Sequence, residues 1–116
     1  MLTDGPLTLD RKEGRDSNTK IFCLTGPLTL TNLFELQTEL RSTPPAPFTI
    51  IDLAGVPYMD SAGMGLLMNQ YVRCQTRGAK LVVSGANSRV MDLFKITKVD
   101  MILPLAATIE EAQAQA

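Results

Sequence analysis

The spacing of apolar residues changes period several times along the chain. Short apolar runs of strand-like composition occupy residues 7–12, 20–26, 48–53, 80–84 and 101–105. Between these runs, apolar residues recur every three or four positions, as on one face of an amphipathic helix. The pattern predicts the order ββαβαβαβα, which is typical of an α/β domain with a mostly parallel sheet.

Polar residues, prolines and capping motifs mark the ends of the predicted helices. Asn32, with Glu35 three residues later, is predicted to cap the first helix, which ends before the prolines of residues 44–47. Thr108 with Glu111 forms a capping box and starts a short closing helix.

The longest predicted helix follows the central apolar run. Ser61 is predicted to be its N-cap, and Gly78, directly after Arg77, is predicted to end it in the left-handed conformation. The next helix has two candidate N-caps, Asn87 and Ser88. The turn that contains Ser61 is thus predicted to join a buried strand to the start of a helix.

A polar turn separates the first two strands, which are predicted to form a hairpin and so to make the sheet mixed. The length of 116 residues fits one domain, which we place at residues 1–116. Within it, we expect residues 1–6 to be a loose lead-in and residues 112–116 to fray.

Composition and charge argue against several kinds of partner. The formal net charge is −1, aromatic residues make up 5% of the chain, and tryptophan is absent. A nearly neutral chain lacks the field that attracts nucleic acid or anionic membranes. Residues 1–6 lack a signal-peptide pattern, and no run approaches about 18 apolar residues. We therefore expect a cytoplasmic protein that binds neither nucleic acid nor membranes.

The residues needed for common catalytic and metal sites are missing or wrongly spaced. The sequence has no histidine, which excludes a Ser-His or Cys-His nucleophile pair. It has no phosphate-binding glycine loop and no carboxylate set with metal-ligand spacing. Cys23 and Cys74 are expected to be buried thiols. We therefore expect no enzymatic activity, no cofactor and no metal.

Asp52 lies late in a predicted buried strand, where a response-regulator receiver carries its phosphorylated aspartate. A receiver also needs an acidic pair for magnesium after its first strand, and Leu24–Gly26 contains none. We expect Asp52 instead to accept hydrogen bonds from nearby loop amides.

The stretch around Ser61 admits two interpretations. A serine at a helix start is commonly an N-cap, worth about 1 kcal/mol of helix stability. Gly63 and Gly65, however, weaken the first helical turn, and glycines there let another molecule approach the backbone. Asp60 makes the turn acidic, and the apolar loop of residues 56–59 is predicted to be exposed, as in a docking surface. These features favour a serine that lies at a docking surface for another molecule.

Several segments match one protein family, in the same order along the chain. Ile50–Leu53 followed by Tyr58–Gly65 resembles the signature of STAS domains (sulfate transporter and anti-sigma factor antagonist). The resemblance continues through Gly78–Leu81, Val90–Thr97 and Thr108–Ala112. In particular, the chain looks like the stand-alone bacterial anti-sigma factor antagonists.

The resemblance implies a single α/β STAS domain with a mixed, mostly parallel β-sheet and helices packed mainly on one face. It also implies an anti-sigma factor antagonist, which binds an anti-sigma factor serine kinase and so releases the sigma factor. In the family, the kinase phosphorylates the serine that matches Ser61, and this modification ends binding. A metal-dependent serine phosphatase reverses it.

The partner surface is expected around Ser61. Asp60, Gly63 and Met64 would shape the contact, and the loops around residues 26–29 and 84–88 are expected at the same end of the sheet. The candidate partner-binding residues are Leu28, Thr29, Met59, Asp60, Ala62, Gly63, Met64, Ser84 and Asn87.

Two positions depart from the family pattern. Ala62 stands where the family often has a second hydroxyl residue, which leaves Ser61 as the one candidate acceptor in the turn. Thr29 stands where an aspartate is common, and the change removes a negative charge close to the serine. An alternative interpretation is therefore a STAS scaffold, or a subunit of a transport or stressosome-like assembly, that acts without phosphorylation.

Overall fold

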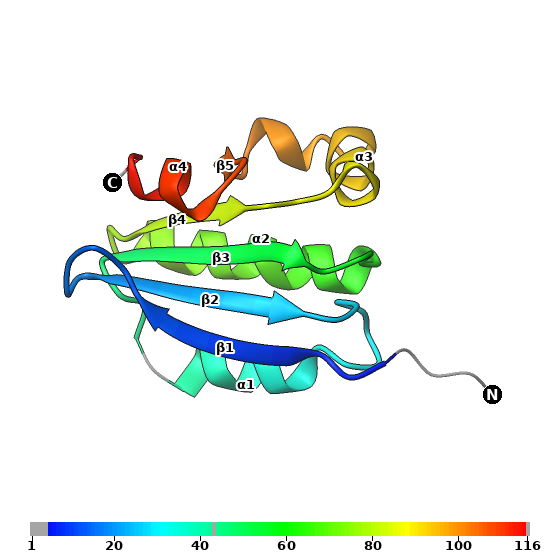
Figure 1. The fold of residues 1–116 in the computed structure, drawn as a ribbon, viewed down its shortest axis with the longest axis horizontal. Coiled ribbons are helices and arrows are strands. Elements are labelled where there is room, and N and C mark those ends of the chain that lie inside the picture. The colour runs from blue at the N-terminus through cyan, green and yellow to red at the C-terminus, as the bar shows by residue number, and fades with distance from the viewer. Residues whose placement is uncertain (1–4, 43, 116) are drawn as a thin grey trace.

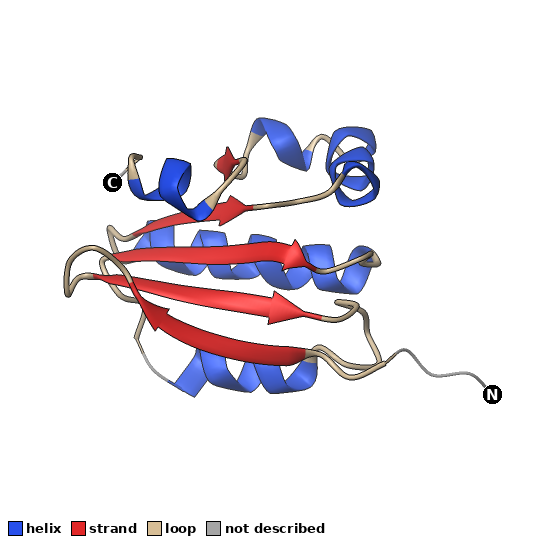
Figure 2. Ribbon diagram, in the orientation of Figure 1, coloured by secondary structure: helices blue, strands red, loops and turns tan. Residues whose placement is uncertain are grey.

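Helices and strands follow one another in the predicted order ββαβαβαβα (Figures 1 and 2). The computed structural model describes residues 5–42 and 44–115. In chain order the elements are β1 (Thr8–Glu13), β2 (Thr19–Thr25), α1 (Phe34–Ser42), β3 (Phe48–Gly55), α2 (Ser61–Thr76), β4 (Lys80–Ser84), α3 (Ser88–Ile96), the 3-10 helix η1 (Val99–Met101), β5 (Leu105–Ala106) and α4 (Ile109–Gln113). The expected lead-in lies mostly outside the described residues, as does the last residue of the expected frayed end.

The strands of the sheet lie side by side in the order in which they occur in the chain. β1 pairs antiparallel with β2, whereas β2, β3, β4 and β5 run parallel. Because crossovers between parallel strands are right-handed, strands added in one direction place their connecting helices on one face. α1 and α2 accordingly lie behind the sheet in Figure 1, and α3 packs into the same core. The predicted mixed sheet with helices mainly on one face is confirmed.

The central strand β3 is buried on both faces. Ile51 pairs with Phe22 of β2 and Val83 of β4, and it packs in the core beneath α1, α2 and α3. Ile50 faces the other side, where it packs with Ala112 of α4. Each such side chain stabilises the fold by about 1.5–3 kcal/mol relative to an exposed one. A strand anchored on both faces holds the loop that follows it in a defined place.

Helix α1 begins later than predicted, and Asn32 is not its N-cap. The side-chain oxygen of Asn32 accepts the backbone N–H of Thr29 at 2.8 Å, and its amide nitrogen donates to the carbonyl of Gly5 at 3.1 Å. The side chain therefore closes the turn before the helix. Regular helix starts two residues later, at Phe34.

The predicted last edge strand exists as β5, but its predicted bounds, residues 101–105, are wrong. Met101 ends η1, and the N–H of Leu103 donates to the carbonyl of Val99 at 2.8 Å. Val99 and Leu103 are the buried side chains, whereas Met101 and Ile102 are exposed. Buried positions four apart suit a helical turn and not the period of two that a strand requires. β4 therefore pairs with β5, and the N–H of Val83 also donates to the carbonyl of Pro104 at 2.9 Å.

Three predicted helix ends are confirmed. Gly78 follows α2 with a φ of +70°, in the left-handed region. Of the two candidates Asn87 and Ser88, Asn87 caps α3, because its side chain accepts the N–H of the third helical residue at 2.8 Å. Thr108 caps α4 and accepts the N–H of Glu111 at 3.1 Å.

A substitution at Lys98 is expected to stabilise the fold. Lys98 has a φ of +62° between α3 and η1, and its side chain is exposed. The left-handed conformation costs an L-residue about 1–2 kcal/mol. Glycine avoids this cost in the folded state, but the greater flexibility of its unfolded chain offsets part of the gain. Lys98→Gly should raise the free energy of unfolding by about 0.5–1 kcal/mol in urea titrations.

Lys95→Gly is the matched control, because Lys95 is an exposed lysine inside α3. This change should lower the free energy of unfolding by about 1 kcal/mol. A loss of stability in Lys98→Gly would contradict the strain at that position.

Candidate functional site

The candidate site is the turn that joins β3 to α2. It lies beyond the carboxyl end of β3, and parallel strands bring the β2–α1 and β4–α3 loops to the same end of the sheet. Loops at this end of an open α/β sheet are the usual place for binding residues. The structure thus places the segments around residues 26–29 and 84–88 at the end of the sheet that carries Ser61.

Asp60, and not Ser61, is the N-cap of α2. Asp60 has an extended backbone, and its Oδ1 accepts the N–H of Gly63 at 3.0 Å. Its Oδ2 accepts the N–H of Leu30 at 3.0 Å. A carboxylate can take both donors at once, whereas a serine at this position has one oxygen. The prediction that Ser61 caps the helix is therefore wrong, and Ser61 becomes the first residue of α2.

A short parallel contact ties the β2–α1 loop to the turn. Leu28 and Met59 form an isolated parallel bridge, in which the N–H of Leu28 donates to Tyr58 at 3.1 Å. The N–H of Asp60 donates back to the carbonyl of Leu28 at 3.3 Å. The chain from Leu28 onward therefore runs beside Asp60 and leads toward Ser61.

Ser61 is exposed at the start of α2. Its neighbours Ala62 and Met64 are partly exposed, and an added Cβ at Gly65 would meet no atom within 4 Å. Small or absent side chains leave the hydroxyl open to a second molecule. The sulfur of Met64 accepts the hydroxyl of Thr97 at 3.2 Å, which links this turn to α3.

Several predicted partner-binding residues are buried in the isolated chain. They support the turn from inside instead of presenting a surface. This group comprises Leu28, Thr29, Met59, Gly63 and Ser84, whereas Asp60, Ala62 and Met64 are partly exposed and Asn87 is exposed.

Thr29 and Gly63 show how this support works. The N–H of Thr29 donates to Asn32, and the hydroxyl of Thr29 lies 3.1 Å from that of Thr31. An added Cβ at Gly63 would overlap the carbonyl oxygen of Leu28 and lie 2.9 Å from its Cγ. Gly63 thus lets α2 pack closely against the neighbouring loop. The packing of the fold therefore explains why a glycine occupies this position.

The expected apolar exposure of residues 56–59 is mostly wrong. Val56 is 1% exposed and Met59 is 9% exposed, because both pack into the main core. Pro57 is exposed, and the half-buried ring of Tyr58 lies 4.9 Å from the guanidinium of Arg89. This loop is a packed connection with a cation–π contact at its surface.

Asn87 connects the turn to α3. Besides capping α3, its amide nitrogen donates to the carbonyls of Val56 at 3.3 Å and Pro57 at 3.1 Å. These bonds hold the loop before Ser61 against α3. Its position fits support of the site as well as contact with a partner.

Asp52 has a different partner from the one expected. The buried hydroxyl of Ser84 donates to Asp52 at 2.7 Å across the β3–β4 pair. A Cβ added at Gly85 would lie 2.7 Å from the same carboxylate, so the loop after β4 closes over it. Within the described residues, no group of three or more metal-binding side chains surrounds this carboxylate or any other. Asp52 thus joins two strands.

The two cysteines are free thiols. Cys74 is buried as expected, whereas Cys23 is only half-buried. Burial raises the pKa of both thiols above the usual value. A raised pKa keeps a thiol protonated and poorly nucleophilic. Neither cysteine is therefore a strong candidate for a reactive group.

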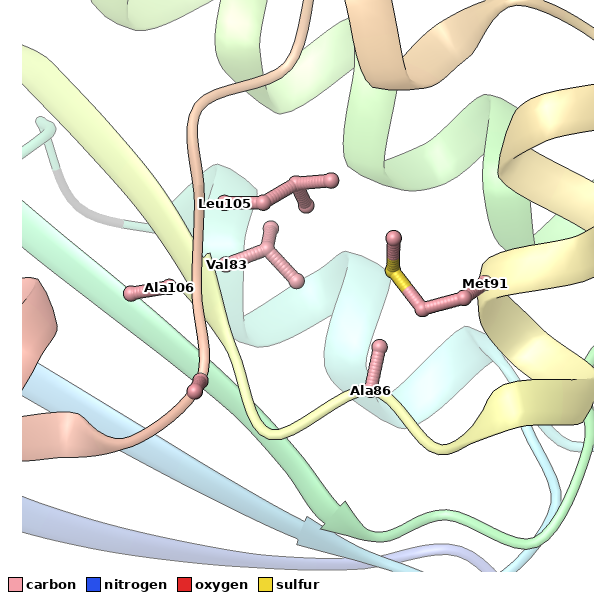
Figure 3. Close-up of a pocket in the computed structure, with 6 residues that line it drawn as sticks. Val83, Ala86, Met91, Leu105 and Ala106 are labelled. Carbon is pink, nitrogen blue, oxygen red and sulfur yellow. The ribbon is translucent and has the colours of Figure 1, made fainter.

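An apolar pocket of about 320 Å³ lies between β4, β5 and α3. Figure 3 shows the side chains of Val83, Met91 and Leu105 facing the same space, with Ala86 and Ala106 at its sides. Ala107 also lines the pocket, and none of these lining residues carries a polar side chain. This pocket therefore offers no group for chemistry, unlike the turn at Ser61.

Two surface residues were missed from the sequence. Leu30 and Phe34 are each 59% exposed, and the N–H of Leu30 is bonded to Asp60. The sequence signal for the exposure of Phe34 was its position outside the helix face that carries the buried Leu36 and Leu40. The contact of Leu30 with Asp60 depends on loop packing and had no local signal.

Comparison with known proteins gives the family. The model of the STAS domain matches residues 11–112, which is most of the chain. The chain belongs to the STAS domain family. Within the described residues of this STAS domain, no helix has both the length and the apolar character needed to cross a membrane.

One curated relative of this STAS domain is the anti-sigma-B factor antagonist of Listeria monocytogenes. The two are 36% identical over 55 residues, which cover 47% of this chain and 48% of the relative. The match thus spans about half the length of that protein.

Solved structures share the fold over nearly the whole STAS domain. An anti-sigma factor antagonist from Mycobacterium paratuberculosis superimposes with a TM-score of 0.81 at 18% identity, over 94% of this chain and 92% of the other. The anti-sigma factor antagonist SpoIIAA in its unphosphorylated form gives a TM-score of 0.77 at 17% identity, over 93% and 95%. At these identities the likeness concerns the fold.

Substitutions at Asp60 should lower stability in a graded way. Asp60→Ala removes the cap, worth about 0.5–2 kcal/mol, and the bond to Leu30, worth about 1 kcal/mol. Asp60→Asn keeps one carbonyl oxygen and should fall between wild type and Asp60→Ala. Urea unfolding followed by circular dichroism tests this order, and equal stability of all three proteins would contradict the bridging role.

Alanine at the two glycines of the first turn should have opposite effects. Gly63→Ala meets the backbone of Leu28 and should lower the free energy of unfolding by about 1–3 kcal/mol. Gly65→Ala enters open space and should raise it by about 0.5–1 kcal/mol, since alanine favours the helix. Thermal unfolding of the pair distinguishes them, and a destabilising Gly65→Ala would be unexpected.

Proposed function

We propose that this STAS domain is an anti-sigma factor antagonist that acts in the cytoplasm by binding and not by catalysis. Its unphosphorylated form binds an anti-sigma factor serine kinase, and the sigma factor is released. The kinase transfers the γ-phosphoryl group of ATP to the Ser61 hydroxyl, which ends binding, and a metal-dependent serine phosphatase removes it. The observation that carries the proposal is the exposed Ser61 on the fixed turn after Asp60.

The position of Ser61 suits a phosphoryl acceptor. The start of a helix favours negative charge, so a phosphate of about −1.5 to −2 is compatible with the folded domain. The carboxylate of Asp60 already occupies the N–H of Gly63, so the phosphate would share the helix end with another negative charge. The modified surface therefore becomes strongly acidic without any requirement for refolding.

At Thr29 the chain departs from the family pattern beside this turn, and the proposal has to work without an aspartate there. An aspartate at this position would add charge close to the serine, and Thr29 instead makes hydrogen bonds within its own turn. The acidic group that lies directly beside Ser61 is Asp60. Kinase recognition then depends on Asp60 and on the shape of the turn.

Phosphorylation of Ser61 is the first test. The chain is incubated with ATP and each purified anti-sigma factor kinase of its source organism, and the peptides are analysed by mass spectrometry. We expect one phosphoryl group, located on Ser61, and none in Ser61→Ala.

Ser88→Ala is a matched control, because Ser88 is the exposed first residue of α3, directly after its cap Asn87. This variant should be phosphorylated like wild type. Binding gives a second measurement: Ser61→Asp should weaken the kinase complex at least about tenfold, equal to 1.4 kcal/mol, while Ser61→Ala binds normally. An unmodified Ser61 and equal affinities would refute the proposal and favour the scaffold interpretation.

A further inference from the structure

A polar groove of about 180 Å³ lies between helices α1 and α2. Besides one leucine from each helix, its described lining consists of polar side chains, namely Gln37, Arg41, Asn69, Gln70 and Arg73. Within each helix these positions recur at spacings of three or four residues, so they share one helix face. The two helices therefore form the walls of the groove.

The lining favours a negatively charged ligand. It combines the guanidinium groups of its arginines with side-chain amides, all of which can donate hydrogen bonds. No carboxylate belongs to the part of the lining that the structure describes. Glu39 of α1 has its carboxylate bonded elsewhere, since it accepts the Nε–H of Arg11 on β1 at 2.7 Å. The groove is therefore positively charged.

The fold holds one of these charges in place. Arg73 is half-buried, and its Nη1 donates to the carbonyl of Leu40 near the end of α1. Arg41 lies in the last turn of the same helix and is exposed. Cations are favourable at any helix C-terminus, so the arginines by themselves do not indicate a ligand.

The side chain of Gln70 gives an independent indication of a ligand. Gln70 is 6% exposed, and buried amides ordinarily have good hydrogen-bond partners. Among the described residues, the hydrogen bond of this side chain is a single long one, from Nε2 to the sulfur of Cys74 at 4.0 Å. Sulfur is a weak acceptor. Gln70 nevertheless lines the groove, so a buried amide without a strong partner opens onto a space that a ligand can fill.

The Gln70 amide can present its donor to this space. Rotation about its last bond exchanges the positions of the oxygen and the NH₂ group. The buried thiol of Cys74 tolerates both orientations, because a protonated thiol can accept a hydrogen bond or donate one. An anion in the groove would thus receive an N–H bond from inside the protein.

We propose that the groove between α1 and α2 binds a small oxyanion, a phosphate or a carboxylate group. The guanidiniums of Arg41 and Arg73 supply the charge, and guanidinium groups suit both kinds of oxyanion. Gln70 supplies a buried amide donor. The volume is several times the roughly 30 Å³ of one water, so the groove can hold such a group and part of the molecule that carries it.

This site is separate from the Ser61 turn. Gln70 lies nine residues after Ser61, or about 14 Å along α2. The inference therefore does not depend on phosphorylation of Ser61, and either proposal can fail without the other.

A titration followed by two-dimensional NMR tests the site. Inorganic phosphate and malonate are added in separate arms at constant ionic strength, with chloride as the reference anion. We expect saturable shifts of the side-chain amide signals of Asn69 and Gln70 in at least one arm. The arm that saturates at the lower concentration identifies the group as phosphate or carboxylate. Shifts that stay linear in both arms would overturn the proposal.

Two variants test the assigned roles. Gln70→Met keeps the length of the side chain and removes the amide, so the dissociation constant should rise at least about tenfold. Arg41→Gln should raise it at least about threefold, a smaller effect because an exposed charge is partly screened. Circular dichroism verifies that both variants fold. Wild-type affinity in both variants would refute the site.

Arg15→Gln is the matched control for charge. Arg15 is exposed in the β1–β2 turn, where its backbone N–H donates to Gln113 of α4 at 2.7 Å. α4 packs with Ile50 on the other face of the sheet, away from the groove. This variant should bind the anion like wild type. A loss equal to that of Arg41→Gln would mean that net charge alone attracts the anion, and the proposed site would be wrong.

Discussion

The carboxylate of Asp60 holds together the two chain segments on which the Ser61 turn depends. One oxygen accepts the N–H of Gly63 at the start of α2, and the other accepts the N–H of Leu30 in the β2–α1 loop. A charged acceptor at a helix N-terminus gains from both the hydrogen bonds and the helix dipole. Because Ser61 follows Asp60 directly, these contacts fix the backbone from which its side chain projects. The exposed serine therefore projects from a turn whose backbone is held in a fixed position.

A comparison with Ser88 shows why the surroundings matter more than the local motif. Both serines are exposed, and each is the first residue of a helix after an Asp or Asn cap. The loop bonded to Asp60, directly before Ser61, adds the largely exposed Leu30.

The sequence by itself determined the order of elements, because periods of 2 and 3.6 are local properties of the chain. It also determined several helix ends, where Gly78, Asn87 and Thr108 act within a few residues of themselves. The continuous apolar run of β3 predicted a buried strand, whereas the order of the strands in the sheet came from the structure. The position of Ser61 at the start of a helix was correct to within one residue.

Tertiary structure alone decided which residue caps that helix. Asp60 and Ser61 are both good caps, and the second donor that favours a carboxylate comes from Leu30, which is 30 residues away in the sequence. The burial of Val56 and Met59 likewise depends on packing into the core formed by distant segments. Local pattern cannot report such contacts, because they arise only when loops from different strands meet at one end of the sheet.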